Sequence, residues 1–405
     1  MSYKQRKVDS IAALCGLIWF AFIIDACFTW FFSWTIRYFL SSFFVFFATS
    51  ILSQNNGLDF SKKRILLFSS IAIWAAIIFF LKFWVVVAIF KFTPFMCIIF
   101  WRDSALQKMY VYLRKFILFY AILSVFVEVL VVTGAWRFLP HTTLPPQDYV
   151  QEELGLTNYF YGLFVIPAED LSLSFYRACG PGREGGHFVF YLGFIYFADK
   201  ALYNKRNIWI LICGMLTLSP NFPVILLITE GYHAIKHKEF IKPIMVVLLF
   251  VVAMALAFVF APENIKDEIV RVILERSLEN NLMKVEDEGV WVLIDGRAGP
   301  YGLQYYESFL RKGTFARLFG SELPDGYYPS DPRFLIMLYG YIGTFVICWC
   351  IITFSIKIEF NLFGFVLLSF AALIFIQRAW MFDQLYWETV MLLIIKEKER
   401  LSYKV

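Results

Sequence analysis

Long apolar runs dominate this chain and leave few folds open to it. About twelve such runs can be marked, separated mostly by short polar connections. They lie near residues 11–31, 34–52, 65–82, 84–101, 116–136, 187–199, 207–218, 222–235, 243–261, 334–356, 359–376 and 384–395. A helix needs about 20 apolar residues to cross the hydrocarbon core of a bilayer. We therefore expect an all-α integral membrane protein with about twelve transmembrane helices, in which residues 1–405 form a single polytopic domain.

The composition agrees with this class and excludes others. Hydrophobic residues make up 60% of the chain and charged residues 17%, whereas soluble domains average about 45–50% and about 25%. This balance excludes a cytosolic enzyme, a disordered chain and a nucleic-acid-binding module. The cysteines form no paired C-x-x-C array, and His233 and His237 stand beside lysines at an expected span end. We expect no metal ion and no cofactor.

Basic residues gather in alternate connections and predict the topology. Because Lys and Arg are retained on the cytoplasmic side of a membrane, connections that carry them should share that side. The basic segments that fall on one side of the twelve-run map are 4–7, 62–64, 102–115, 200–206, 236–242 and 396–404. The pattern predicts that both termini are cytoplasmic.

Two long polar segments fall on the opposite side, as extracytoplasmic loops at residues 137–186 and 262–333. Connections of this length are more often functional than incidental. Within the second loop, residues 266–284 place apolar side chains four apart between charged ones, which predicts an amphipathic helix on the membrane surface.

The end of the first long loop, residues 177–188, combines glycines with charges of both signs. Gly180 permits close approach of a ligand to the backbone, while Arg177 and Arg183 have the geometry to pair with phosphate oxygens. A helix that begins near Gly186 would add exposed N–H groups suited to a diphosphate. The same residues also fit a glycine-rich helix entry whose Arg and Glu side chains pair at the interface.

This segment carries a family resemblance. Arg177, Gly180, Glu184 and His187 stand at the spacing of R-x-x-G-x-x-x-E-P-G-H. The pattern resembles the signature of bacterial O-antigen and capsular polysaccharide polymerases of the Wzy type. Gly185 replaces the usual proline, which removes a helix-start signal but keeps the charged positions.

The resemblance continues along the chain in the same order. Asp331-Pro-Arg-Phe334-Leu335, followed by Gly340-Tyr-Ile-Gly343, resembles the closing signature of the family. In the family, a stretch of the large outer loop precedes this signature, and it is similar to Arg297, Tyr305-Tyr306 and Leu318-Phe319-Gly320 of this chain. Residues 216–219 resemble the Leu-Thr-Leu-Ser motif of the family.

The resemblance implies a membrane glycosyltransferase that acts on the outer face of the bacterial inner (plasma) membrane. Such enzymes transfer a growing glycan from undecaprenyl diphosphate to the non-reducing end of a lipid-linked oligosaccharide repeat unit. Donor and acceptor are both polyprenyl-linked, so membrane lipid surrounds the reaction. The resemblance also implies a chain-length regulator as a protein partner.

A diphosphate leaving group needs positive charge, and an acceptor hydroxyl needs a base. Arg177 and Arg297 are the first candidates for the diphosphate. Weaker substrate-binding candidates are Gly180, Arg183, Arg311 and Arg317, and the candidate bases are Asp331, Glu184 and His187.

Each of these residues also has a structural interpretation. Asp331 before Pro332 suits a helix N-cap, and Arg297 is close enough to Asp295 for a loop ion pair. Glu184 would neutralise the neighbouring arginines, and His187 would be an interfacial histidine.

Two other functions stay open. An O-antigen ligase uses the same donor but transfers finished glycan to a lipid A core, and ligases usually have His where this chain has Asp331. A flippase or secondary transporter would explain the charges within apolar runs. These charges are Arg37, Lys82, Lys91, Glu128 and Glu388.

Overall fold

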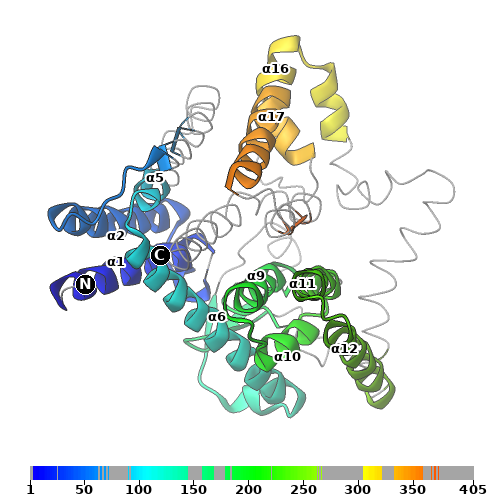
Figure 1. Cartoon of the computed structure of the whole chain (residues 1–405). Coiled ribbons are helices and arrows are strands. Elements are labelled where there is room, and N and C mark those ends of the chain that lie inside the picture. Colours follow the sequence, from blue (N-terminus) through cyan, green and yellow to red (C-terminus); the bar gives the residue numbers. More distant parts are fainter. Residues whose placement is uncertain are drawn as a thin grey trace. The chain divides into compact units, whose positions relative to one another are not determined.

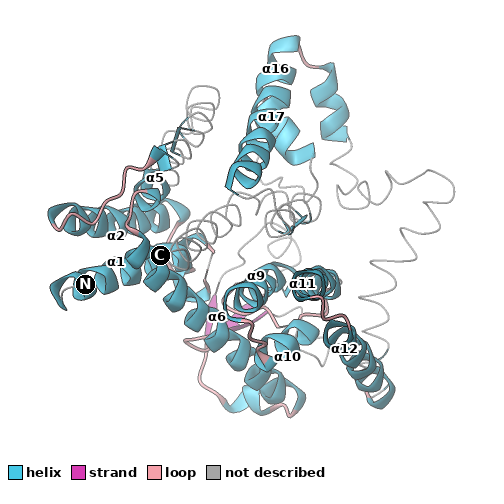
Figure 2. Ribbon diagram, viewed as in Figure 1, coloured by secondary structure: helices cyan, strands magenta, loops and turns pink. Residues whose placement is uncertain are grey.

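The computed structural model describes residues 3–24, 26–62, 93–144, 157–167, 178–182, 185–219, 221–261, 304–321 and 333–358, with isolated positions between them. The described part is mostly helical (Figures 1 and 2). It divides into two compact units. The first comprises Met1–Ile24, Phe32–Leu113 and Ile294–Val405, and the second comprises Asp25–Phe31 and Arg114–Leu293.

In the first unit, small residues allow the N-terminal helices to pack closely. Helix α1 (Tyr3–Ile23) packs along α2 (Trp34–Gln54). Ala12 and Ala13 of α1 are fully buried. A Cβ atom added at Gly16 would lie 2.5 Å from the sulfur of Met109, so only glycine fits against the start of helix α6 (Asp103–Val132). The short helix α5 (Thr93–Ile99) packs against α2.

The apolar run predicted at 11–31 is not one helix. Helix α1 ends at Ile23, and Cys27–Thr29 form the 3-10 helix η1. Cys27 and Trp30 are buried against strands of the second unit. The apolar residues after Ile23 therefore serve a different core, which hydropathy alone does not distinguish from a continuing span.

The first unit also contains a pair of helices from the C-terminal part of the chain. Helix α16 (Thr314–Phe319) lies beside α17 (Arg333–Ile358), as Figure 1 shows in yellow and orange. A further helix at residues 304–311 precedes α16. Helix α17 is broken at Gly340, where φ is 69° and ψ is 179°.

The second unit is built on four helices that follow one another closely. They are α9 (Gly185–Tyr203), α10 (Ile208–Leu216), α11 (Asn221–His237) and α12 (Ile241–Phe260). Helix α11 contacts α9 and α12, and every residue of α9 from Phe188 to Lys200 is buried. The nine residues of α10 span roughly 14 Å, too little to cross a bilayer core of about 30 Å. The run predicted as a span at 207–218 is therefore a short helix and a turn.

Strands were not expected in this chain, yet the predicted loop at 137–186 contains a small sheet. Strands β1 (Thr142–Leu144), β2 (Asn158–Phe160) and β3 (Val165–Pro167) pair antiparallel in that order, drawn in magenta in Figure 2. Ile166 packs against Val127 and Val131 of α6, while Leu144 and Val165 pack against η1. Strands of three residues are shorter than the four to eight or so over which alternation is detectable, so the sequence pattern did not predict them.

The apolar helices confirm a helical membrane protein. Among the described residues, three helices are long and apolar enough to span a bilayer: Thr35–Gln54, Asp103–Val132 and Ile241–Phe260. Helix α12 is exposed along most of its length, as expected for contact with lipid. The number of about twelve spans stays a prediction. The runs at 65–82, 359–376 and 384–395 and the amphipathic helix at 266–284 lie largely outside the described residues.

Candidate functional site

Two of the four sequence motifs meet in the turn that leads into α9. The backbone nitrogen of Ala178 donates to the carbonyl oxygen of Leu216 at 3.0 Å, so the glycine-rich motif touches the Leu-Thr-Leu-Ser motif. The Cys27 nitrogen donates to the Pro181 oxygen at 2.7 Å and holds the turn from its other side. Ala178 and Cys179 are buried. Backbone hydrogen bonds therefore fix this segment before α9 begins.

Gly180 fills a position that no other residue suits. Its φ is +62°, in the left-handed region, and an added Cβ would lie 2.5 Å from the ring carbon Cε2 of Phe188. The Phe188 ring packs directly on the glycine. The close approach seen at Gly180 is thus made by a side chain of the same chain, and the predicted approach of a ligand to this residue stays a prediction.

His187 lies in the first turn of α9 and is half-buried, next to the fully buried Phe188. This is where the sequence predicted it, at the entry to a helix. Arg177, Arg183 and Glu184, which the motif places around it, lie outside the described residues.

The Leu-Thr-Leu-Ser motif forms the tight turn between α10 and α11. Leu218 has a positive φ of 48°, and the Thr217 hydroxyl donates to the Gly214 oxygen at 2.7 Å. Gly214 lets the Phe222 ring pack against α10, since an added Cβ would lie 2.5 Å from its Cε2 atom. The motif thus reverses the chain after a helix too short to cross a bilayer.

The other two motifs meet at the break in α17. Gly320 ends α16 with φ of 90° and ψ of 174°. An added Cβ on Gly320 would lie 2.6 Å from the Leu338 carbonyl carbon and 2.8 Å from the Gly340 nitrogen. The Ser321 nitrogen donates to the Met337 oxygen at 2.8 Å. The predicted outer loop therefore crosses α17 backbone to backbone.

Aromatic residues join the same segment to α17 on both sides of the break. The ring of Phe309 lies 6.2 Å from that of Tyr306 and 6.4 Å from that of Tyr341. The Arg333 guanidinium lies over the Tyr306 ring at 5.7 Å. Phe309 is only 1% exposed.

The candidate arginines of this region differ in their surroundings. Arg311 is 83% exposed and lies 3.8 Å from the Glu307 carboxylate, too exposed for a strong ion pair. Arg317, in the last turn of α16, is partly buried, and its Nε atom has no hydrogen-bond acceptor among the described residues. Arg297 and Asp331 lie outside the described residues.

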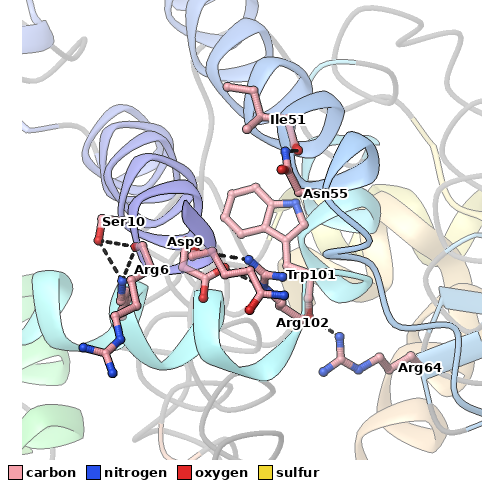
Figure 3. A network of polar contacts seen from close by, with 10 residues as sticks. Arg6, Asp9, Ser10, Ile51, Asn55, Arg64, Trp101 and Arg102 are labelled. Atoms are coloured by element: carbon pink, nitrogen blue, oxygen red, sulfur yellow. Dashed lines mark hydrogen bonds and ion pairs between the residues drawn. The ribbon is translucent and has the colours of Figure 1, made fainter. Parts of the chain in front are cut away.

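A polar network that sequence reasoning missed joins α1, α2 and the start of α6 (Figure 3). The fully buried Asp9 accepts a hydrogen bond from Arg102 Nε at 2.6 Å. Lys108 donates to the Ser10 hydroxyl at 2.8 Å, and Trp101 Nε1 donates to the Thr49 hydroxyl at 2.9 Å. These contacts tie three separate segments of the first unit together.

Arg64 has the most buried basic side chain of this network. Its side chain is 5% exposed, and its guanidinium binds Asp59 at 3.0 Å as well as Asp103 and the backbone oxygens of Ile99 and Trp101. Arg64 and Arg102 belong to segments that the sequence assigned only a topological role. Asp59, five residues before Arg64 in the sequence, is the local signal that was missed.

Buried acids also hold bases in the second unit. Arg114 Nη2 donates to Asp199 Oδ2 at 2.7 Å, and Asp199 is fully buried. Glu230, 1% exposed, binds Arg206 at 2.8 Å, Lys200 at 3.8 Å and the Tyr196 hydroxyl. Hydrogen bonding to Glu230 raises the pKa of Arg206 above its ordinary value. These groups hold fixed charges and position helices.

The described residues contain no cluster of three metal-ligating side chains. The His233 and His237 rings lie 4.4 Å apart on α11, at the spacing noted in the sequence. Arg37 donates to the Phe32 oxygen at 2.8 Å.

No known protein family, no curated protein and no solved structure matches this chain.

Proposed function

We propose that this chain is a membrane glycosyltransferase that polymerises lipid-linked oligosaccharide repeat units. It transfers the growing glycan from undecaprenyl diphosphate to the non-reducing end of a new unit, at the outer face of a bacterial inner membrane. Both termini are cytoplasmic in this proposal, a chain-length regulator is its protein partner, and neither a cofactor nor a metal ion is required.

One observation supports the proposal above others. The four motifs that carry the resemblance come together in contacting pairs. Ala178 binds Leu216, and Gly320 crosses Gly340. The members of the two pairs are 38 and 20 residues apart along the sequence, and their proximity is what a site shared by the motifs requires.

The proposed chemistry is a single displacement at the donor sugar carbon. A bond forms from the acceptor hydroxyl oxygen to that carbon, and the bond from the carbon to the diphosphate oxygen breaks, with inversion. Arg177 and Arg297 stabilise the charge that develops on the departing diphosphate, with Arg183, Arg311 and Arg317 as secondary contacts. Asp331, Glu184 or His187 accepts the hydroxyl proton, a contribution worth about 10²–10⁴-fold.

The experiment measures the length ladder of surface glycan in a strain deleted for this gene. The strain is complemented with wild type, Arg177→Ala, Arg297→Ala or Asp331→Ala, and membrane insertion is checked for each variant. We expect a single repeat unit in the deletion strain, a restored ladder with wild type, and failure of the arginine variants at normal protein level.

Other outcomes identify the alternatives. Long polymer that stays on its carrier lipid would favour an O-antigen ligase. A ladder that is unchanged by deletion would contradict both glycan functions and favour a flippase or transporter.

A further inference from the structure

The strongest unassigned feature is the crossing of Gly320 and Gly340. Gly320 has φ of 90° and ψ of 174°, and Gly340 has φ of 69° and ψ of 179°. This combination of positive φ with ψ near 180° is essentially confined to glycine. The backbone conformation alone therefore requires glycine at both positions, apart from any contact.

The contact adds a second, steric requirement. The added Cβ of Gly320 would overlap the backbone of Leu338 and Gly340, and that of Gly340 would overlap the backbone of Leu318 and Gly320. These neighbours are main-chain atoms, so no side chain can rotate away to make room. We call this pair, with the Ser321–Met337 hydrogen bond beside it, the glycine clasp.

The clasp ties one candidate site residue to a fixed place. Arg317 lies three residues before Gly320, in a helical turn that ends at the clasp because the Gly320 nitrogen donates to the Ala316 oxygen at 2.7 Å. The buried Nε atom of Arg317 has no acceptor among the described residues. Arg317 as a whole is only partly buried, and no described acid neutralises it, so its charge is available to an anionic oxygen of a ligand.

We propose that Gly320 and Gly340 are positioning residues, which lock the α16 segment onto the break in α17 and hold Arg317 toward a phosphate oxygen of the substrate. The inference rests on the proposed glycosyl transfer, for which the phosphate is that of the lipid carrier. Rigid docking removes the freedom of a long loop at the moment of reaction, and misplacement by about 1 Å costs about 10²-fold in rate.

The test compares three glycine variants in the full-length protein. Gly320→Ala and Gly340→Ala introduce the clash. Gly313→Ala is the matched control, because Gly313 lies in the same segment with φ of −58° and open space where a Cβ would be.

Docking of the α16 segment onto α17 is measured separately from enzymatic activity. Ser321→Cys with Met337→Cys places a cysteine pair at the backbone hydrogen bond of the clasp, and mass spectrometry detects the joined peptides after oxidation. We expect cross-linking in the wild-type and Gly313→Ala backgrounds and its loss in Gly320→Ala and Gly340→Ala.

Activity is measured as polymerisation of a purified lipid-linked repeat unit, with kcat and KM determined separately. We expect Gly320→Ala to lower kcat by about 10²-fold with little change in KM, and Gly313→Ala to leave both unchanged. In a variant that is merely misfolded, protein level and KM would change together with kcat.

Two results would overturn the clasp: cross-linking in Gly320→Ala at the wild-type yield, and a normal kcat in a variant that no longer cross-links. Absence of polymerisation by the wild-type protein would instead contradict the proposed function, so the two failures are distinguishable.

Discussion

The polar network at the start of α6 and the glycine clasp at α17 solve the problem of joining distant segments in opposite ways. In the network, Asp9 and Asp103 hold Arg102 and Arg64 through charged hydrogen bonds. In the clasp, no side chain takes part, and two main chains touch directly. In the network, arginines and aspartates neutralise one another, whereas Arg317 near the clasp has no acid partner among the described residues. Charge that is already neutralised supports a fold, and charge left over is available to a ligand.

The largest effect is expected from removing a buried acid. Glu230→Ala leaves Lys200, itself 1% exposed at the side chain, and Arg206 without their shared carboxylate. An uncompensated buried charge costs about 3–5 kcal/mol. Thermal unfolding of the detergent-solubilised protein should show a large fall in Tm.

Glu239→Ala is the control for this variant. Glu239 pairs with Lys242 at 2.9 Å, but both side chains are exposed. We expect no measurable change in Tm. Equal losses for the two variants would contradict the distinction between buried and exposed ion pairs.

The next effect is the loss of stability when a close-packed glycine gains a side chain. Gly180→Ala combines a positive φ with overlap on the Phe188 ring, and the two penalties together amount to about 2–5 kcal/mol. The free energy of unfolding measures the total. Gly162→Ala shares the positive φ of 88° but meets open space, so the difference between the variants isolates the ring contact. Equal losses would show that Phe188 moves aside freely.

A smaller effect is expected from a change that keeps the charge. Arg114→Lys retains a positive charge beside Asp199 but loses one of the two parallel hydrogen bonds. We expect a loss of about 1–2 kcal/mol, because hydrogen bonds to charged groups are stronger than neutral ones. Arg114→Met removes the charge as well and should cost more. If the lysine variant is as stable as wild type, the bidentate geometry contributes nothing.

The smallest expected effect has the opposite sign. Gly231 lies within α11, without a positive φ and with open space around an added Cβ. Gly231→Ala should stabilise the protein by about 0.5–1 kcal/mol, since alanine loses less conformational entropy in a helix. A rise in Tm checks this. A fall would indicate that the open space is occupied in the membrane, by lipid or another helix.

Sequence reasoning predicted four helices of the described part closely, because an apolar run long enough for a bilayer leaves the backbone little choice but a helix. It placed the starts of α1 and α6 too late, by 8 and 13 residues. Helices α2, α9, α11 and α12 begin within about three residues of the predicted runs. The same reasoning failed for the short sheet near Tyr161 and for the end of α1 at Ile23. In both places, contacts with remote residues decide the local structure.

The candidate site was predictable in part. Gly180 and His187 lie at a turn and helix entry, as expected from the motif, and Gly320 and Gly340 belong to segments that the resemblance selected. Their pairing was not predictable, because nothing in the spacing of two glycines indicates that their backbones cross. The remote acid partners Asp103, Asp9 and Asp199 were missed because pairing over 39 to 93 residues leaves no local pattern.

The sequence by itself determined that the protein is a helical membrane protein with long polar segments, since hydrophobicity acts locally and additively along a chain. It also marked the residues from which the function is proposed. Only the tertiary structure decided which charges are neutralised and which glycines are obligatory. Both depend on atoms brought close from distant parts of the chain, where hydrogen bonds and steric overlap act over a few ångströms.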